Sequence, residues 1–268
     1  MIFLCAIPLF PLPTSVKIWL AKKHGYDGIE ILVTAKNKHR LKKISEEVHS
    51  SGLGVSFHQP WSLAENPTHG VNKILDIIGV LPETDYTLGN FFQSMPADVP
   101  VTLYADRIRE EWNHPRKRFQ TCSVFNKNLE FKLSYKEFCK EVLWQKAKVT
   151  FDTQQVLEYY LNIQGVEGLL GYNRDELLDI LIHCWNDLGG KENVEEIHWN
   201  DSSPSLGHTA GRNVFLGSGV LPLDQFAEYI LKDGWDYKNK TVVPEVGSPL
   251  TLILKGGEVR NKTAEYFQ

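Results

Sequence analysis

The sequence predicts a (β/α)8 barrel, on three observations. Short apolar runs alternate with amphipathic segments along most of the 268 residues, which is the pattern of parallel strands joined by helices. Eight such runs occur, and eight βα repeats in about 250 residues fit one closed barrel, so we expect a single domain spanning 1–268. No Gly-rich turn follows the first run, as an open dinucleotide-binding sheet would require.

The predicted strands are short apolar runs bounded by turn residues. In chain order they are 1–10, 26–33, 53–61, 99–105, 119–126, 148–152, 194–201 and 241–247. The opening run "MIFLCAIPLF" has no positively charged segment before it and is soon interrupted by prolines. We therefore interpret it as a buried first strand rather than as a signal peptide.

The predicted helices carry apolar residues at helical spacing. They are 15–25, 37–52, 71–81, 106–112, 134–147, 173–190 and 222–234. Ser134 and Glu137 stand in the capping-box positions of one helix, and Gly25 and Gly52 stop the first two. The tail 251–268 is expected to pack as a closing hairpin or helix.

The charge and composition of the chain argue against two classes of protein, those that bind duplex DNA and those that span a membrane. The formal net charge is -4, so a duplex DNA partner, which needs a clustered basic surface, is not expected. The densest basic runs are "HRLKK" (39–43) and "HPRKR" (114–118), and the first lies on a predicted helix, where we interpret it as a solvated face. No stretch approaches the ~20 apolar residues of a membrane helix. The sequence carries no indication of the oligomeric state.

The cysteines follow no disulfide or zinc-site spacing. They are Cys5, Cys122, Cys139 and Cys184. We interpret them as free thiols of a reducing compartment, and we expect a cytoplasmic protein.

Polar residues follow the ends of the predicted strands, where a parallel barrel carries its chemistry. They are Glu30, His58, Asp152, His198, Asp201 and Glu245. Carboxylates and imidazoles that converge on one mouth are able to hold a divalent cation. Asp152 has an alternative role as a helix cap, and His58 as a structural hydrogen-bonding residue. Glu245 lies within "VVPEV", so we expect it to be partly buried and to need a partner.

Five motifs extend this pattern over nearly the whole chain. They are "GYDGIEI", "VSFHQPW", "FDTQQ", "HWNDSSPSLGHTAGRNVFLGSG" and "VPEVG", at the second, third, sixth, seventh and eighth predicted strands. Together they resemble the xylose-isomerase-like barrels, the superfamily that contains sugar and sugar-phosphate isomerases and epimerases and also endonuclease IV (AP endonuclease family 2). The resemblance implies a barrel fold with a metal site at its mouth.

The departures from the family pattern imply a depleted metal site. Gln155 stands where the strand-six pattern has His, and Gly211 and Asn213 stand where the strand-seven loop has Asp and His. At strand five, where the family carries Glu, "CSVFNKN" offers Phe125 and Asn126. The strand-four His is also missing from "VTLYAD". A three-metal phosphodiester hydrolase is therefore not expected.

The ligand residues of the family pattern that this sequence keeps are Asp152, His198 and Glu245. They imply at most one divalent ion, Mn²⁺, Mg²⁺ or Zn²⁺. By the resemblance, the chain would be a sugar or sugar-phosphate isomerase or epimerase that moves a proton next to a carbonyl. Glu245 and His58 would be the catalytic residues. The residues assigned to substrate binding are Glu30, Trp61, Asp201 and Arg212, and His208 is assigned to solvated loop.

Two alternatives stay open. The first is a non-catalytic barrel that binds a sugar, because a shared fold does not establish chemistry. The second is an endonuclease-IV-like hydrolase with a reduced metal centre. The expected partner in the main hypothesis is a small-molecule sugar or sugar phosphate, with neither nucleic acid nor membrane.

Overall fold

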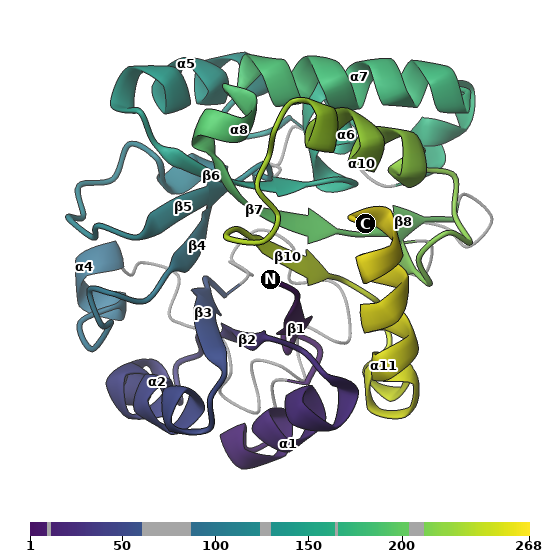
Figure 1. Cartoon of the computed structure of the whole chain (residues 1–268). Helices are drawn as coiled ribbons and strands as arrows, with labels where there is room; N and C mark the ends of the chain where they lie inside the picture. Colours follow the sequence, from purple (N-terminus) through teal and green to yellow (C-terminus); the bar gives the residue numbers. More distant parts are fainter. Residues whose placement is uncertain (10–11, 61–86, 124–129, 164–165, 204–211) are drawn as a thin grey trace.

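The computed structural model describes residues 1–9, 12–60, 87–123, 130–163, 166–203 and 212–268. Its centre is an eight-stranded parallel sheet in the order β1-β2-β3-β4-β5-β6-β7-β10 (Figure 1). The strands are β1 (Phe3–Cys5), β2 (Gly28–Leu32), β3 (Gly54–His58), β4 (Val101–Tyr104), β5 (Lys117–Gln120), β6 (Lys148–Asp152), β7 (Val194–Trp199) and β10 (Thr241–Pro244). A parallel bridge between Ile2 and Val242 joins the first strand to the last. The predicted (β/α)8 barrel is confirmed.

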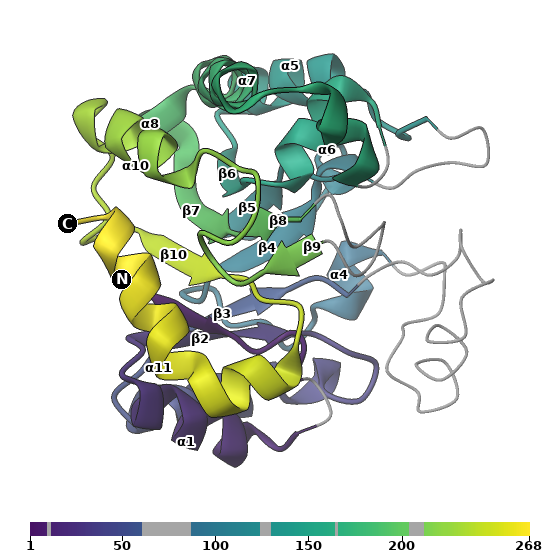
Figure 2. The same cartoon turned by 90° about the vertical axis from the view of Figure 1, so that its right-hand side faces the viewer.

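Helices surround the sheet. The α-helices are α1 (Thr14–His24), α2 (Leu41–Ser50), α4 (Leu88–Phe91), α5 (Tyr135–Gln145), α6 (Gln155–Leu161), α7 (Arg174–Asp187), α8 (Gly190–Asn193), α10 (Leu223–Lys232) and α11 (Pro249–Tyr266). Short 3-10 helices cover Lys38–Arg40, Ala105–Arg107 and Val166–Gly171. The tail forms the helix α11, which runs along the outside of the barrel beside α1 (Figure 2). No helix among the described residues is long and apolar enough to cross a membrane.

Local sequence signals account for the helix ends. Ser134 and Glu137 form the predicted capping box, with reciprocal bonds between each side chain and the other backbone N–H. Asn173 and Glu176 form a second capping box at the start of α7. The predicted helix 106–112 is wrong, because only the single 3-10 turn Ala105–Arg107 forms there. The predicted helix 71–81 lies outside the described residues.

The fifth strand differs from its prediction. We expected it at 119–126, and the structure places β5 at Lys117–Gln120, paired with β4 and β6. The apolar residues of "FQTCSVFN" account for the later predicted position, which leaves the basic residues before them outside any predicted strand or helix. Arg118 is nevertheless buried in the barrel, because Glu196 on β7 neutralises it at 2.9 Å.

The interior of the barrel is largely polar. Thr102 and Thr150 both donate to Glu196 Oε1, at 2.9 and 3.3 Å, beside the bond from Arg118. These residues come from four neighbouring strands, β4 to β7, so the network ties that side of the barrel together. A small apolar cluster fills the rest: Phe3, Cys5, Ile7, Leu32 and Val243. Gly28 is required beside Phe3, since a Cβ there would lie 2.4 Å from the ring.

A second, two-stranded sheet follows β7. Its strands β8 (Asp201–Ser202) and β9 (Arg212–Val214) are antiparallel. This hairpin stands beside the carboxyl ends of the barrel strands, close to β7 and β10 (Figure 2). It belongs to the stretch of chain that carries the longest family-like motif.

Candidate functional site

Five of the six polar strand-end residues predicted from the sequence meet inside one mouth of the barrel. They are Glu30, His58, Asp152, His198 and Glu245, and all five are buried. The sixth, Asp201, is buried nearby in the β8–β9 hairpin. The carboxyl ends of parallel strands share one edge, which explains why residues far apart in the chain converge.

His198 lies at the centre of this group. Its Nε2 is 3.2 Å from Glu30 Oε1 and 3.5 Å from Glu196 Oε1, and its Nδ1 is 3.1 Å from Glu245 Oε1. Burial alone would lower the pKa of His198, but the charges of Glu30 and Glu245 raise it well above its usual value. Without a bound cation, the surrounding carboxylates therefore favour the protonated form of His198.

Asp152 caps a helix with one carboxylate oxygen and presents the other to the site. Its Oδ1 accepts the backbone N–H groups of Gln154 and Gln155, at 3.1 and 2.8 Å, and so caps the start of α6. Its Oδ2 faces the site and accepts a bond from Gln120 Nε2 at 3.0 Å. Burial raises the pKa of Asp152 to about 7, and the nearby charge of Glu245 adds to this shift.

Gln120 is the site residue that the sequence analysis missed. Its Oε1 lies 3.0 Å from His58 Nε2, and its Nε2 lies 3.3 Å from His198 Nδ1 as well as bonding Asp152. The prediction that strand five ends in Phe125 and Asn126 is wrong, since β5 ends at Gln120. Two polar residues spaced two apart, Arg118 and Gln120, were the available signal of a strand with a polar inner face.

Glu245 is buried and partnered, as expected. Asn200 Nδ2 donates to its Oε2 at 3.0 Å, and His198 pairs with its Oε1. Burial opposes ionisation, but His198 holds the pKa of Glu245 below its ordinary value. Its exposure is 8%, compared with 0% for Glu30 and Asp152. Glu245 is therefore an ionised carboxylate with partial access to the mouth.

Asp201 organises the loop that follows it. Its carboxylate accepts backbone N–H groups from Ser202, Gly217, Gly219 and Leu221, at 2.8 to 3.2 Å. A Cβ at Gly219 would lie 2.1 Å from Asp201 Oδ1, so glycine is needed there. Because both of its carboxylate oxygens accept hydrogen bonds from the loop, Asp201 stabilises the loop at the edge of the barrel mouth.

The remaining predicted residues are only partly placed. Trp61 and His208 lie outside the described residues, as do Gly211, Phe125 and Asn126. Arg212 and Asn213 belong to the strand β9, and Gln155 is the first residue of α6.

The donor atoms fit one divalent cation. Ligand atoms of Asp152, His198 and Glu245 lie within 4.8 Å of one another, as do those of Glu30, His58 and His198. Two carboxylates and an imidazole suit Zn²⁺ or Mn²⁺. Glu30 Oε2 is buried with no hydrogen-bond partner among the described residues, so one carboxylate oxygen of this group still lacks a donor.

The position of the Gln120 amide beside Asp152 and His198 leads to a prediction about cation affinity. We expect Gln120→Glu to bind Mn²⁺ roughly 10- to 100-fold more tightly than the unaltered chain, because it adds a fourth ligand and one negative charge. Isothermal titration of chelator-treated protein measures this. Gln145→Glu, the same change at an exposed position on α5, is the control and should leave the affinity unchanged. Equal affinity of both variants would show that Gln120 does not face the cation.

Comparisons with known proteins support the fold. No protein-family model matches the chain, and no curated protein matches it in sequence. The solved structure of the TTHB071 protein from Thermus thermophilus, soaked with ZnCl2, matches with a TM-score of 0.51 and 14% identity over 98% of each chain. A D-allulose 3-epimerase from Methylomonas sp. matches with a TM-score of 0.50 and 14% identity over 99% of this chain and 96% of that one. At 14% identity, these matches show a shared barrel fold over nearly the whole chain.

Proposed function

We propose that this chain is an isomerase or epimerase of a sugar or sugar phosphate, which moves a proton on the carbon beside a carbonyl. The observation that carries the proposal is the meeting of Glu245, His58 and His198 in one buried mouth. A carboxylate base, a second proton carrier and a fixed positive charge are the groups that this reaction needs.

Glu245 is assigned as the base. Its lowered pKa keeps it ionised at neutral pH, and the bond from Asn200 fixes the orientation of its carboxylate. The partial exposure of Glu245 lets a proton taken from carbon exchange with solvent before a proton is returned to the substrate.

His58 is assigned as the second proton carrier. Its Nδ1 lies 2.6 Å from the carbonyl oxygen of Gln59, which fixes the ring and leaves Nε2 toward Gln120. A substrate hydroxyl that replaces the Gln120 contact would meet Nε2 directly. His58 then exchanges a proton with that oxygen, or with the face of the carbon opposite Glu245.

Negative charge develops on the carbonyl oxygen as the proton leaves. The His198 imidazolium and the Gln120 amide N–H supply positive charge for that oxygen from groups that are already fixed. When a divalent cation is bound, His198 would have lost a proton to hold it together with Asp152 and Glu245, and the cation would polarise the same oxygen in place of the imidazolium. The shared fold with a D-allulose 3-epimerase supports the assignment to sugar chemistry.

Proton exchange in D₂O tests the proposal. The purified chain is incubated with a panel of ketoses and ketose phosphates, with and without Mn²⁺, and proton NMR follows the signal of the carbon-bound hydrogen beside the carbonyl. We expect deuterium to replace that hydrogen in at least one sugar. Sugar binding without exchange would instead support a binding barrel, and zinc-dependent incision of abasic-site DNA would support a hydrolase.

A further inference from the structure

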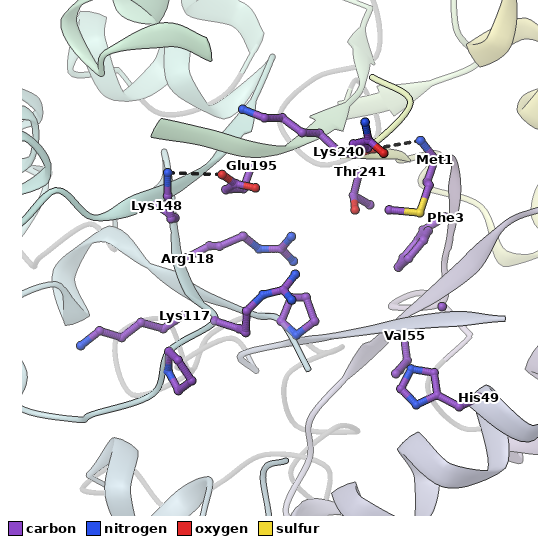
Figure 3. Close-up of a pocket in the computed structure, with 15 residues that line it drawn as sticks. Met1, Phe3, His49, Val55, Lys117, Arg118, Lys148, Glu195, Lys240 and Thr241 are labelled. Carbon is purple, nitrogen blue, oxygen red and sulfur yellow. Dashed lines mark hydrogen bonds and ion pairs between the residues drawn. The ribbon is translucent and has the colours of Figure 1, made fainter. Parts of the chain in front are cut away.

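A cavity of about 350 Å³ opens at the other end of the barrel, where the strands begin. Its walls come from the starts of β1, β3, β5, β6 and β10 and from Glu195 on β7. Figure 3 shows the Arg118 side chain extending into the middle of the ring of lining residues, with Phe3 and Thr241 beyond its tip. Phe3 and Gly54 are part of the lining, and the Phe3 ring occupies the space that a side chain at Gly54 would take.

The lining of this cavity is strongly basic in an acidic protein. Its cationic side chains are Arg116, Lys117, Arg118, Lys148 and Lys240. Against them stand two carboxylates, Glu195, paired with Lys148 at 3.3 Å, and Glu196, paired with Arg118 at 2.9 Å. The whole chain has a net charge of -4, so the excess of cations here is a local feature. Three of the five come from the basic run "HPRKR", which the candidate active site does not use.

Hydrogen bonds to backbone carbonyls orient the lysine side chains and leave some of their N–H donors unused. Lys117 Nζ donates to the Trp112 carbonyl at 2.7 Å, and Lys240 Nζ donates to the Val194 carbonyl at 2.8 Å. An ammonium has three donors, so these bonds orient the amines without exhausting them. The exposed Arg116 guanidinium has no ion-pair partner among the described residues, and the buried Arg118 Nε has no hydrogen-bond partner there.

We propose that this cavity at the strand starts is a binding site for a small phosphate-bearing anion, either inorganic phosphate or a phosphate monoester. Guanidinium groups match the geometry of a phosphate group, and lysines add point charge. The volume lies at the low end of the range for small-molecule sites, which suits an anion of this size. The site is independent of the proposed isomerase activity and lies at the opposite end of the barrel.

Phosphorus NMR or calorimetric titration tests the site, at low ionic strength and in a buffer without phosphate. The probes are inorganic phosphate and a hexose 6-phosphate. We expect one saturable site whose affinity falls as salt is added. The double variant Arg116→Gln/Lys148→Gln should weaken binding at least about tenfold. The double control Lys136→Gln/Lys140→Gln, at exposed positions of α5, removes the same number of charges outside the cavity and should change nothing.

The outcomes separate the alternatives. Tighter binding of the hexose phosphate identifies a phosphorylated metabolite as the ligand, and equal binding identifies the free ion. Binding that survives the double variant but is lost in Glu245→Gln would place the phosphate at the other mouth and overturn the proposal. Absence of saturable binding would also overturn it, as would much tighter binding of DNA or heparin through the same residues.

Discussion

Replacing Glu245 by glutamine should slow deuterium exchange at the substrate carbon by about 10²- to 10⁴-fold, the usual contribution of a positioned general base. The amide has nearly the same shape and can still accept the bond from Asn200, so the loss comes from proton affinity. Initial rates of exchange, measured by proton NMR on the best substrate of the panel, give the ratio directly.

Two controls make this result specific. Glu258→Gln removes a carboxylate from the exposed side of α11 and should leave the exchange rate unchanged. Thermal unfolding of Glu245→Gln should show a folded chain, because the variant removes one of several carboxylates crowded around His198. If Glu245→Gln exchanges protons as fast as the unaltered chain, Glu245 is not the base.

The strand order and most of the mouth could be predicted from the sequence because both follow from periodicity. In a closed parallel barrel every strand ends at the same edge, so a polar residue just after an apolar run is placed in the mouth once the run is recognised. Glu30, His58, Asp152, His198 and Glu245 were found in this way.

Gln120 was missed for a physical reason. A barrel buries polar residues in pairs, and Arg118 is buried only because Glu196 reaches it from β7. That pairing joins residues 78 positions apart and leaves no trace in the local pattern. A window centred on "KRFQ" therefore resembles a loop, and the strand was assigned to the apolar letters that follow. Because the predicted fifth strand extends too far along the chain, its predicted end falls on Phe125 and Asn126 instead of on Gln120.

Asp201 illustrates a second limit. Its place after a predicted strand predicts contact with a substrate, and that assignment stays a prediction. The structure adds a role that the sequence pattern does not indicate, since four backbone N–H groups converge on its carboxylate. That role depends on the path of residues 215–221, which periodicity does not specify.

The buried pair Arg118–Glu196 leads to a prediction about stability. Glu196→Gln should lower the free energy of unfolding by roughly 3–5 kcal/mol at neutral pH, because it leaves the Arg118 charge buried without compensation. Glu195→Gln is the matched control at the adjacent position. Glu195 is only partly buried and pairs with Lys148 at the surface, so its replacement should cost less than about 1 kcal/mol. Urea unfolding at pH 7 measures both.

The pH dependence of this difference provides a second check. Burial would raise the pKa of Glu196, but Arg118 and His198 outweigh it and hold the value at about 2, below the ordinary 4.5. A carboxylate whose pKa is depressed on folding contributes stability above its unfolded pKa and loses that contribution as the pH falls through its folded pKa. The difference between the unaltered chain and Glu196→Gln should therefore be complete above about pH 4.5 and shrink toward pH 2. A difference that stays constant from pH 7 to pH 2.5 would mean that the charge of Glu196 does not stabilise the barrel.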